Sequence, residues 1–136
     1  MSKENVEIVR RGYQLFQAGD FEAVAALFSS GVELPDAGGL GIGDIVPGTR
    51  TGPEGFLRTT EETRDAFEDF RVEPEGFIDA GEVVVVPVRI SGRGRASGVE
   101  QEARLVHLWA LRNGKVIRNE IFRTVEEALE TAGMGE

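Results

Sequence analysis

The dipeptide Asn113-Gly114 lies between two long runs of strand-forming residues, and it constrains the fold more than any other feature of the sequence. Asparagine followed by glycine is the preferred pair for a two-residue hairpin turn, so the runs on either side are expected to pair as antiparallel strands. These strands are predicted at Val99 to Leu111 and at Lys115 to Phe122. Upstream, residues 70–80 and 82–90 are predicted to form two more. The second half of the chain therefore predicts an antiparallel meander.

The run over residues 82–90 contains four consecutive valines, Val83-Val84-Val85-Val86, which indicates a strand buried on both faces. Pro87 follows directly. Because proline donates no backbone hydrogen bond, we expect a bulge there or an amide position that faces an edge.

Capping residues and apolar residues at three- and four-residue spacing predict two helices in the first 31 residues. The first begins near Ser2 and ends at Gly19. The second has Asp20 as its N-cap and is expected to end near Ser30-Gly31. A short strand is predicted at Val32 to Leu34.

A glycine-rich loop is predicted over residues 35–52, followed by two more helices. One begins with Pro53 in its first turn and runs to about Glu68. The other opens with a capping box, Thr124-Val125-Glu126-Glu127, and extends through Ala132. No βαβ alternation is present, so the order predicts a single α+β domain over residues 1–136, with helices on one face of an antiparallel sheet.

Composition narrows the classes of function. The chain has no cysteine, one histidine and a formal net charge of −9. Disulfides and thiolate chemistry are thereby excluded, and we expect no metal and no cofactor. A strongly acidic chain repels nucleic acid and anionic membranes, so neither is an expected partner. No signal peptide or membrane-spanning run is evident, which predicts a cytoplasmic protein.

The sequence resembles the nuclear transport factor 2-like superfamily in three segments: Ala18-Gly19-Asp20, Ala26-Leu27-Phe28 and Asn113-Gly114-Lys115-Val116. Within that superfamily it is most similar to the SnoaL-like proteins and the ketosteroid isomerases. The resemblance implies a cystatin-like cone of helices on a strongly curved sheet. It further implies a small, largely apolar or carbonyl-bearing ligand in the cone, and a homodimer.

The resemblance also suggests catalytic positions. Alignment on Ala26-Leu27-Phe28 places Asp36 where the isomerases have their general base. Their two oxyanion donors fall on Gly12 and Val106, neither of which can donate from its side chain. In the similar limonene-type epoxide hydrolases, an Arg-x-Asp element and another Asp correspond to Arg104-Leu105-Val106 and Ile121, so the arginine is present and both acids are missing.

If Val106 faces the cavity, as the resemblance implies, alternation assigns other strand residues to the same face. Arg104 and Asn119 are then candidate catalytic groups beside Asp36. The other ligand-binding candidates are Tyr13, Phe16, Val106, Leu108, Ile117, Ile121 and Arg123. His107 and Trp109 are placed on the opposite sheet face, the outer one, where they are expected to contribute to the homodimer or to pack against a helix.

Each polar candidate also has a structural interpretation. Asp36 follows Pro35 in a sequence typical of turns, Arg104 has acidic residues to pair with, and Asn119 can satisfy a buried amide network. Two hypotheses therefore remain open. The chain is an isomerase- or cyclase-like enzyme in which Asp36 moves a proton, or it is a non-catalytic module that binds a small ligand or a partner subunit.

Overall fold

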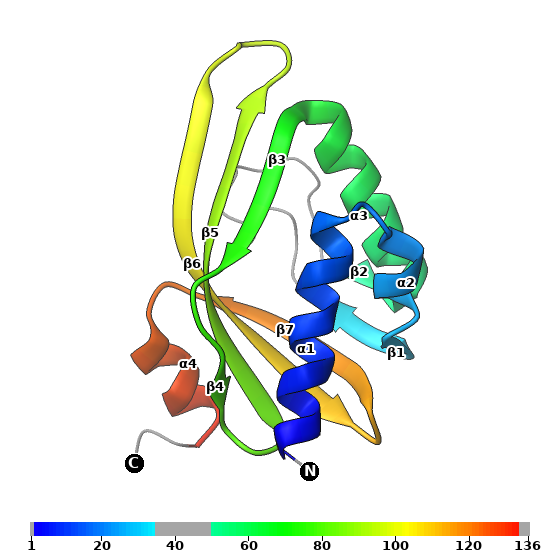
Figure 1. The fold of residues 1–136 in the computed structure, drawn as a ribbon, viewed down its shortest axis with the longest axis vertical. Coiled ribbons are helices and arrows are strands. Elements are labelled where there is room, and N and C mark those ends of the chain that lie inside the picture. The colour runs from blue at the N-terminus through cyan, green and yellow to red at the C-terminus, as the bar shows by residue number, and fades with distance from the viewer. Residues whose placement is uncertain (1, 35–49, 134–136) are drawn as a thin grey trace.

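The computed structural model describes residues 2–34 and 50–133 (Figure 1). None of the helices in this part of the chain is long and apolar enough to cross a membrane. The elements are α1 (Ser2–Gln17), α2 (Phe21–Ala25), β1 (Phe28–Leu34), β2 (Arg50–Thr51), α3 (Gly52–Ala66), β3 (Phe67–Pro74), β4 (Ile78–Asp79), β5 (Val83–Gly94), β6 (Glu100–Arg112), β7 (Lys115–Phe122) and α4 (Val125–Thr131).

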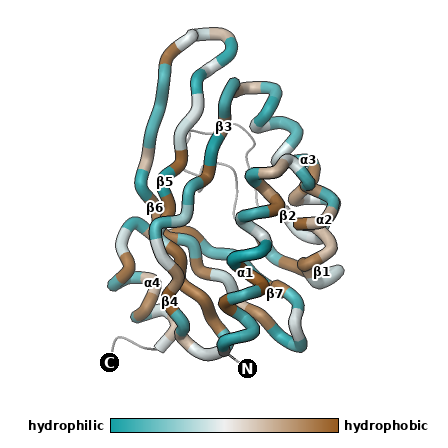
Figure 2. Tube along the Cα trace, in the orientation of Figure 1, coloured by the Kyte–Doolittle hydropathy of each residue, from teal (hydrophilic) through white to brown (hydrophobic). Residues whose placement is uncertain are grey.

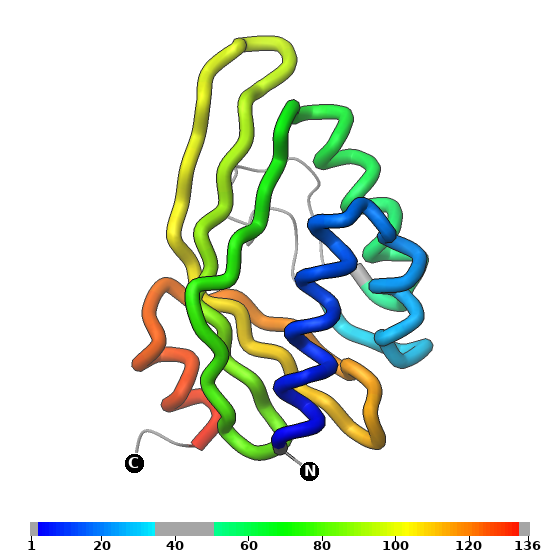
Figure 3. Tube along the Cα trace, viewed as in Figure 1, coloured from blue at the N-terminus to red at the C-terminus, as the bar shows by residue number. Residues whose placement is uncertain are grey.

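The strands form one curled sheet in the order β2-β1-β7-β6-β5-β3, with β4 paired to β5 beyond the end of β3. All pairs are antiparallel except β1 with β7. The register shifts within the pairs of β1, β3 and β7, and such irregularities bend a sheet. Helices α1, α2 and α3 lie on the concave side, as the traces in Figures 1 and 3 show. The predicted α+β cone is confirmed.

The fourth helix departs from the expected arrangement because it packs on the opposite face of the sheet. There Ala128 of α4 is fully buried against Val85 and Val106. The neighbouring Val84 and Val86 belong to the larger core on the side of α1. The run of valines is thus buried on both faces, and Figure 2 shows this lower part of β5 and β6 as the most hydrophobic stretch of the sheet.

Helix caps predicted from the sequence are present. The Asp20 carboxylate accepts a hydrogen bond from the Ala23 amide, 3.2 Å away, at the start of α2. The Thr124 hydroxyl accepts from the Glu127 amide at 3.1 Å, at the start of α4. Each cap satisfies a backbone N–H that has no partner inside its helix.

The second helix is shorter than expected. It ends at Ala25, and β1 already begins at Phe28. The reason is tertiary: Phe28 pairs in parallel with Val116, and the Leu27 carbonyl accepts from the Val116 amide at 3.0 Å. Strand pairing overrides the weak helical preference of this segment.

Pro87 sits where the neighbouring strand is interrupted. The last pair of β3 with β5 is Pro74 with Val88, and the first pair of β4 is Ile78 with Val85. Because the amide position of Pro87 falls in this gap, the missing hydrogen bond is not required there.

The hairpin turn has the expected conformation, with φ of 52° at Asn113 and 77° at Gly114. We expect Gly114→Ala to lower the free energy of unfolding by about 1 kcal/mol, because a Cβ strains a left-handed residue. Urea unfolding followed by circular dichroism measures this loss. Gly31→Ala is a matched control, since a Cβ there meets no atom within 4 Å and φ is not positive. An equal loss in both variants would contradict the assignment of strain to the turn.

Candidate functional site

A cavity lies between helices α1 to α3 and the concave face of the sheet. The space open to the centre of a water molecule is about 120 Å³. Most of the wall is aliphatic or aromatic, and among the described residues that line the cavity none is charged. The side chains in the wall that carry a polar atom are Tyr13, Thr59, Thr60, Thr63, His107, Trp109 and Asn119.

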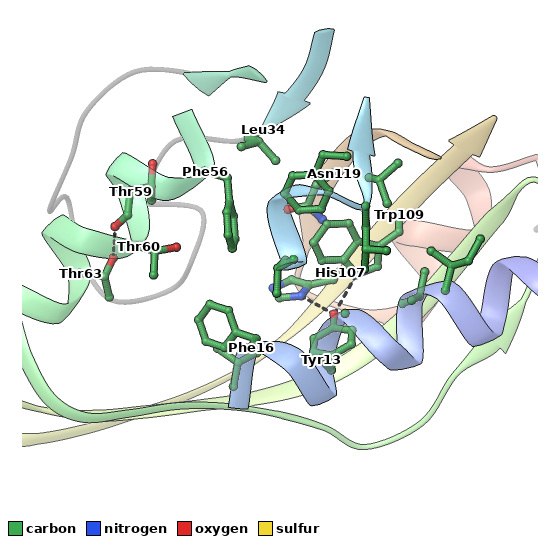
Figure 4. Close-up of a pocket in the computed structure, with 18 of the residues that line it drawn as sticks. Tyr13, Phe16, Leu34, Phe56, Thr59, Thr60, Thr63, His107, Trp109 and Asn119 are labelled. Carbon is green, nitrogen blue, oxygen red and sulfur yellow. Dashed lines mark hydrogen bonds between the residues drawn. The ribbon is translucent and has the colours of Figure 1, made fainter. Parts of the chain in front are cut away.

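Three of these side chains form a buried hydrogen-bond chain, drawn with dashed lines in Figure 4. The Trp109 Nε1–H donates to the Tyr13 hydroxyl oxygen at 2.8 Å. The Tyr13 hydroxyl lies 2.7 Å from Nδ1 of His107. The chain joins α1 to β6 across more than 90 residues of sequence, and both Tyr13 and His107 are buried.

The direction of the chain follows from the number of donors. Trp109 can only donate, and the single hydroxyl proton of Tyr13 has Nδ1 of His107 as its acceptor. If His107 donated through Nδ1 instead, the hydroxyl proton of Tyr13 would lose its acceptor. The imidazole therefore carries its proton on Nε2. That N–H is buried and has no hydrogen-bond partner in the part of the chain that the structure describes.

Burial keeps both titratable groups of the chain neutral. It lowers the pKa of His107 to about 4 from an ordinary value of 6.5. It raises the pKa of Tyr13, an effect that the hydrogen bond from Trp109 only partly opposes. At neutral pH the cavity wall thus contains a neutral imidazole, whose buried Nε2–H is a hydrogen-bond donor without full charge.

Asn119 stands next to this chain on β7, directly across from Trp109. Its Nδ2 donates to the Leu108 carbonyl at 3.0 Å and more weakly to the Glu120 carbonyl at 3.4 Å. Both contacts are to acceptors, which fixes the orientation of the amide. The buried amide network expected for Asn119 therefore accounts for the hydrogen bonds of its side-chain nitrogen.

The opposite side of the cavity is formed by α3, which contributes Thr59, Thr60 and Thr63 (Figure 4). Thr63 donates its hydroxyl to the Thr59 carbonyl at 2.8 Å, a common bond within helices. The hydroxyl of Thr59 is buried and has no partner among residues 2–34 and 50–133. Among the described residues of the cavity wall, Thr59 Oγ1 and His107 Nε2 are thus buried polar atoms without a hydrogen-bond partner.

Comparison with known proteins identifies the fold family. A family model for the SnoaL-like domain matches residues 9–119. The chain belongs to the SnoaL-like family. The resemblance predicted from the sequence is confirmed, and the matched segment contains most of the residues that line the cavity.

Several solved structures share the fold. A nuclear transport factor 2-like protein of unknown function from Burkholderia pseudomallei has a TM-score of 0.75 at 24% identity, over 93% of this chain and 95% of that one. TerC, co-crystallised with polyporic acid, has a TM-score of 0.74 at 25% identity, over 96% and 98%. A proposed polyketide cyclase from Sinorhizobium meliloti has 0.69 at 21%, over 89% and 98%. No curated protein sequence gives a significant match.

The SnoaL-like cavity of this chain uses the opposite face of β6 from the one predicted. His107 and Trp109 line it. Val106 instead packs against Val85 and Ala128 beneath α4, and Leu108, fully buried, shares that side of the strand by alternation. The prediction that Val106 and Leu108 face the cavity is therefore wrong.

The reversal has a physical cause. Val106, His107 and Leu108 are all buried, because helices cover both faces of the sheet at this point. Alternation separates the two sets of residues, but hydrophobicity cannot then decide which set faces the cavity. The resemblance placed Val106 at a cavity position. An error of one residue in that placement moves every side chain of the strand to the other face.

The prediction of a dimer contact through His107 and Trp109 is also wrong. His107 is 4% exposed and both side chains are hydrogen-bonded inside the domain. Both side chains bond to Tyr13 of α1, in agreement with the alternative expectation that they pack on the helix side. The homodimer itself stays a prediction.

Tyr13, Phe16 and Asn119 do line the SnoaL-like cavity. Ile121 pairs with His107 and so shares its face, while Ile117 lies at the bulge where the register of β6 with β7 shifts. Their contribution to ligand binding stays a prediction.

Both arginines proposed for the site lie elsewhere. The Arg104 guanidinium is 3.6 Å from the Glu75 carboxylate, and both side chains are largely exposed, so its interpretation as an ordinary ion pair fits the structure. Arg123 is exposed at the start of α4. Asp36, the predicted general base, lies outside the described residues and stays a prediction.

Sequence reasoning missed His107, Trp109 and the α3 threonines as cavity residues. One signal was available: the chain has a single Tyr, a single Trp and a single His. All three meet in one hydrogen-bond chain, which their positions in sequence do not indicate.

Proposed function

We propose that this SnoaL-like domain binds a small, neutral and mainly apolar molecule in the cavity, with a carbonyl or similar acceptor oxygen bound by His107 Nε2–H. The observation that carries the proposal is this buried N–H without a partner. An unsatisfied buried donor costs about 1–3 kcal/mol, and a ligand oxygen would remove that cost. The fixed proton on Nε2 favours a ligand group that accepts a hydrogen bond.

The rest of the wall supports a neutral, apolar ligand body. Phe16, Phe28 and Phe56 contribute aromatic surface, with Phe28 and Phe56 edge to face at 5.0 Å between ring centroids. An anionic ligand would lose its hydration without meeting a positive group among the described lining residues. TerC, a relative of the same fold, was co-crystallised with a small molecule, polyporic acid.

Nε2 of His107 is not accessible to water in this structure, so a ligand reaches it only when a neighbouring side chain moves. Phe16 and Phe56 are only half-buried and lie between His107 and α3 in Figure 4. Rotation of one of these rings would enlarge the cavity toward the imidazole. A modest rearrangement of this kind is common when small ligands bind.

A neutral His107 would also polarise a ligand carbonyl, which is useful for proton abstraction at an adjacent carbon. An isomerase- or cyclase-type reaction needs a base as well, and Asp36 is the predicted one. Catalysis by Asp36 stays a prediction, whereas binding rests on described residues.

The proposal is tested with two bicyclic compounds of nearly equal shape, 1-tetralone and its hydrocarbon analogue tetralin. We expect the ketone to bind about fivefold more tightly, because one neutral hydrogen bond contributes about 1 kcal/mol. Isothermal titration calorimetry measures both affinities. Fluorescence gives a second readout, since Trp109 is the only tryptophan and lines the cavity.

Two variants provide the controls. His107→Phe should bind both compounds equally, and His107→Gln, which returns an N–H close to the position of Nε2, should recover part of the preference. Equal affinity of the wild-type protein for the ketone and the hydrocarbon would contradict the proposal.

A further inference from the structure

A second hollow lies outside the cone, beside the edge strand β3, and we call it the β3 groove. Its walls are β3, the C-terminal parts of α1 and α3, and the start of α2 (Figures 1 and 3). The space open to the centres of water molecules is about 500 Å³, which is in the size range of small-molecule sites. Phe16, Phe70 and Val72 line both the groove and the cone, so they separate the two.

Arginine is concentrated in the β3 groove, although the chain has a net charge of −9. Arg64, Arg71 and Arg95 line it. Within residues 2–34 and 50–133, no carboxylate lies within 4.0 Å of any of the three guanidinium groups. Three positive charges without an ion pair thus meet in one hollow of an acidic protein.

The acidic side chains of the groove have partners of their own. Asp69 lies 3.5 Å from Arg93, and Glu73 lies 3.0 Å from Arg89. Neither of these two arginines lines the groove. The lining carboxylates therefore do not pair with the groove arginines, which remain available to an anion.

The protein itself holds two of the groove arginines in place. Arg95 donates from its backbone amide to the Ala66 carbonyl and from Nε to the Arg64 carbonyl, both at 2.9 Å. These bonds anchor it at the C-terminal end of α3. The Arg64 guanidinium lies over the ring of Phe21, 5.2 Å from the centroid. Guanidinium groups held in this way lose less freedom when they bind a carboxylate.

The apolar part of the groove is aromatic. Four of the eight phenylalanines of the chain line it: Phe16, Phe21, Phe67 and Phe70. The ring centroid of Phe16 lies 5.1 Å from that of Phe21 and 6.4 Å from that of Phe70. Phe70 in turn lies 6.3 Å from Phe67. The rings thus form one continuous surface from α2 to β3, which suits a ligand with a flat ring system.

We infer that the β3 groove is a second binding site, specific for a small aromatic carboxylate. Arg64 and Arg95 bind the carboxylate, and the phenylalanine rings contact the ring system. An inorganic anion such as phosphate would gain nothing from the aromatic surface. The inference does not rest on the proposed function, because the ligand is anionic and the hydrogen-bond chain around His107 takes no part.

The test compares 2-naphthoate with 2-naphthamide, which share a ring system and differ in charge. We expect the wild-type protein to bind 2-naphthoate about tenfold more tightly, because charge-assisted hydrogen bonds to arginine are stronger than neutral ones. Acetate, a carboxylate without rings, should bind at least about tenfold more weakly than 2-naphthoate. Isothermal titration calorimetry at one ionic strength measures all three affinities.

Substitutions assign the site. Arg64→Gln and Arg95→Gln should each weaken the binding of 2-naphthoate about threefold or more and leave that of 2-naphthamide unchanged. The double variant should bind both compounds equally. Arg112→Gln is the matched control, because it removes the same charge from an exposed arginine at the β6–β7 hairpin that does not line the groove. It should keep the full preference for 2-naphthoate.

Several results would overturn the inference. Equal binding of 2-naphthoate and 2-naphthamide by the wild-type protein is one, and a preference that persists in the double variant is another. An equal loss in Arg112→Gln and Arg64→Gln would show that net charge alone is responsible. Equal affinity for acetate and 2-naphthoate would exclude an aromatic ligand. The preference for 1-tetralone over tetralin tests the proposed function separately.

Discussion

We expect Tyr13→Phe to lower the free energy of unfolding by about 2–4 kcal/mol, although it removes a single oxygen atom. The hydroxyl accepts from Trp109 Nε1 at 2.8 Å and meets Nδ1 of His107 at 2.7 Å. Without it, both nitrogens remain in the interior with no partner. Each such group costs about 1–3 kcal/mol, more than the net worth of an ordinary hydrogen bond.

Urea unfolding followed by circular dichroism measures the effect of Tyr13→Phe, because the tryptophan signal itself changes in this variant. A double-mutant cycle with Trp109→Phe isolates one link of the chain. We expect a coupling free energy of about 1 kcal/mol or more between the two positions, since they are in direct contact. A loss below about 0.5 kcal/mol in Tyr13→Phe would show that the chain contributes little to stability.

Acid should destabilise the protein through His107. Its pKa is about 4 in the folded state and 6.5 ordinarily, so between these values the unfolded chain binds a proton that the folded protein does not. This contribution to stability is complete above pH 6.5 and is lost as the pH falls toward 4. The shift corresponds to about 3 kcal/mol in total, with a slope near 1.4 kcal/mol per pH unit at about pH 5.

The variant that tests this effect is His107→Asn, because its Oδ1 can still accept from Tyr13 while the side chain does not titrate. Urea unfolding of both proteins is measured from pH 7 to pH 4. Carboxylates contribute equally to both curves, so the difference between the proteins reports His107. We expect the wild-type curve to fall more steeply below pH 6.5, and parallel curves would contradict a buried neutral imidazole.

Helix caps and the hairpin turn, which depend on residues close together in the sequence, were predicted well. Asp20 and Thr124 cap the helices where expected, and Asn113-Gly114 forms the turn between β6 and β7. These signals work because the donors, acceptors and φ preferences involved lie within a few residues of one another. The end of α2 was missed because Phe28 pairs with Val116, far along the chain.

The candidate site was predicted less well than the fold. Tyr13 and Asn119 lie in the cavity wall as expected, but Val106 and Leu108 face α4, and His107 and Trp109 take their place. The alternation along β6 was correct. The choice of which set of residues faces the cavity was wrong, because a strand covered by helices on both sides has no polar face to mark the exterior.

The sequence by itself determined the local elements, their order and hence the SnoaL-like cone, because capping, turn chemistry and hydrophobic periodicity are local properties. Only the tertiary structure decided what the cone contains. The meeting of Tyr13, His107 and Trp109 depends on how α1 packs across β6, and the position of α4 on the other face selects which side chains of β6 turn inward. Packing between distant segments thus leaves one imidazole N–H without a partner in an apolar cavity.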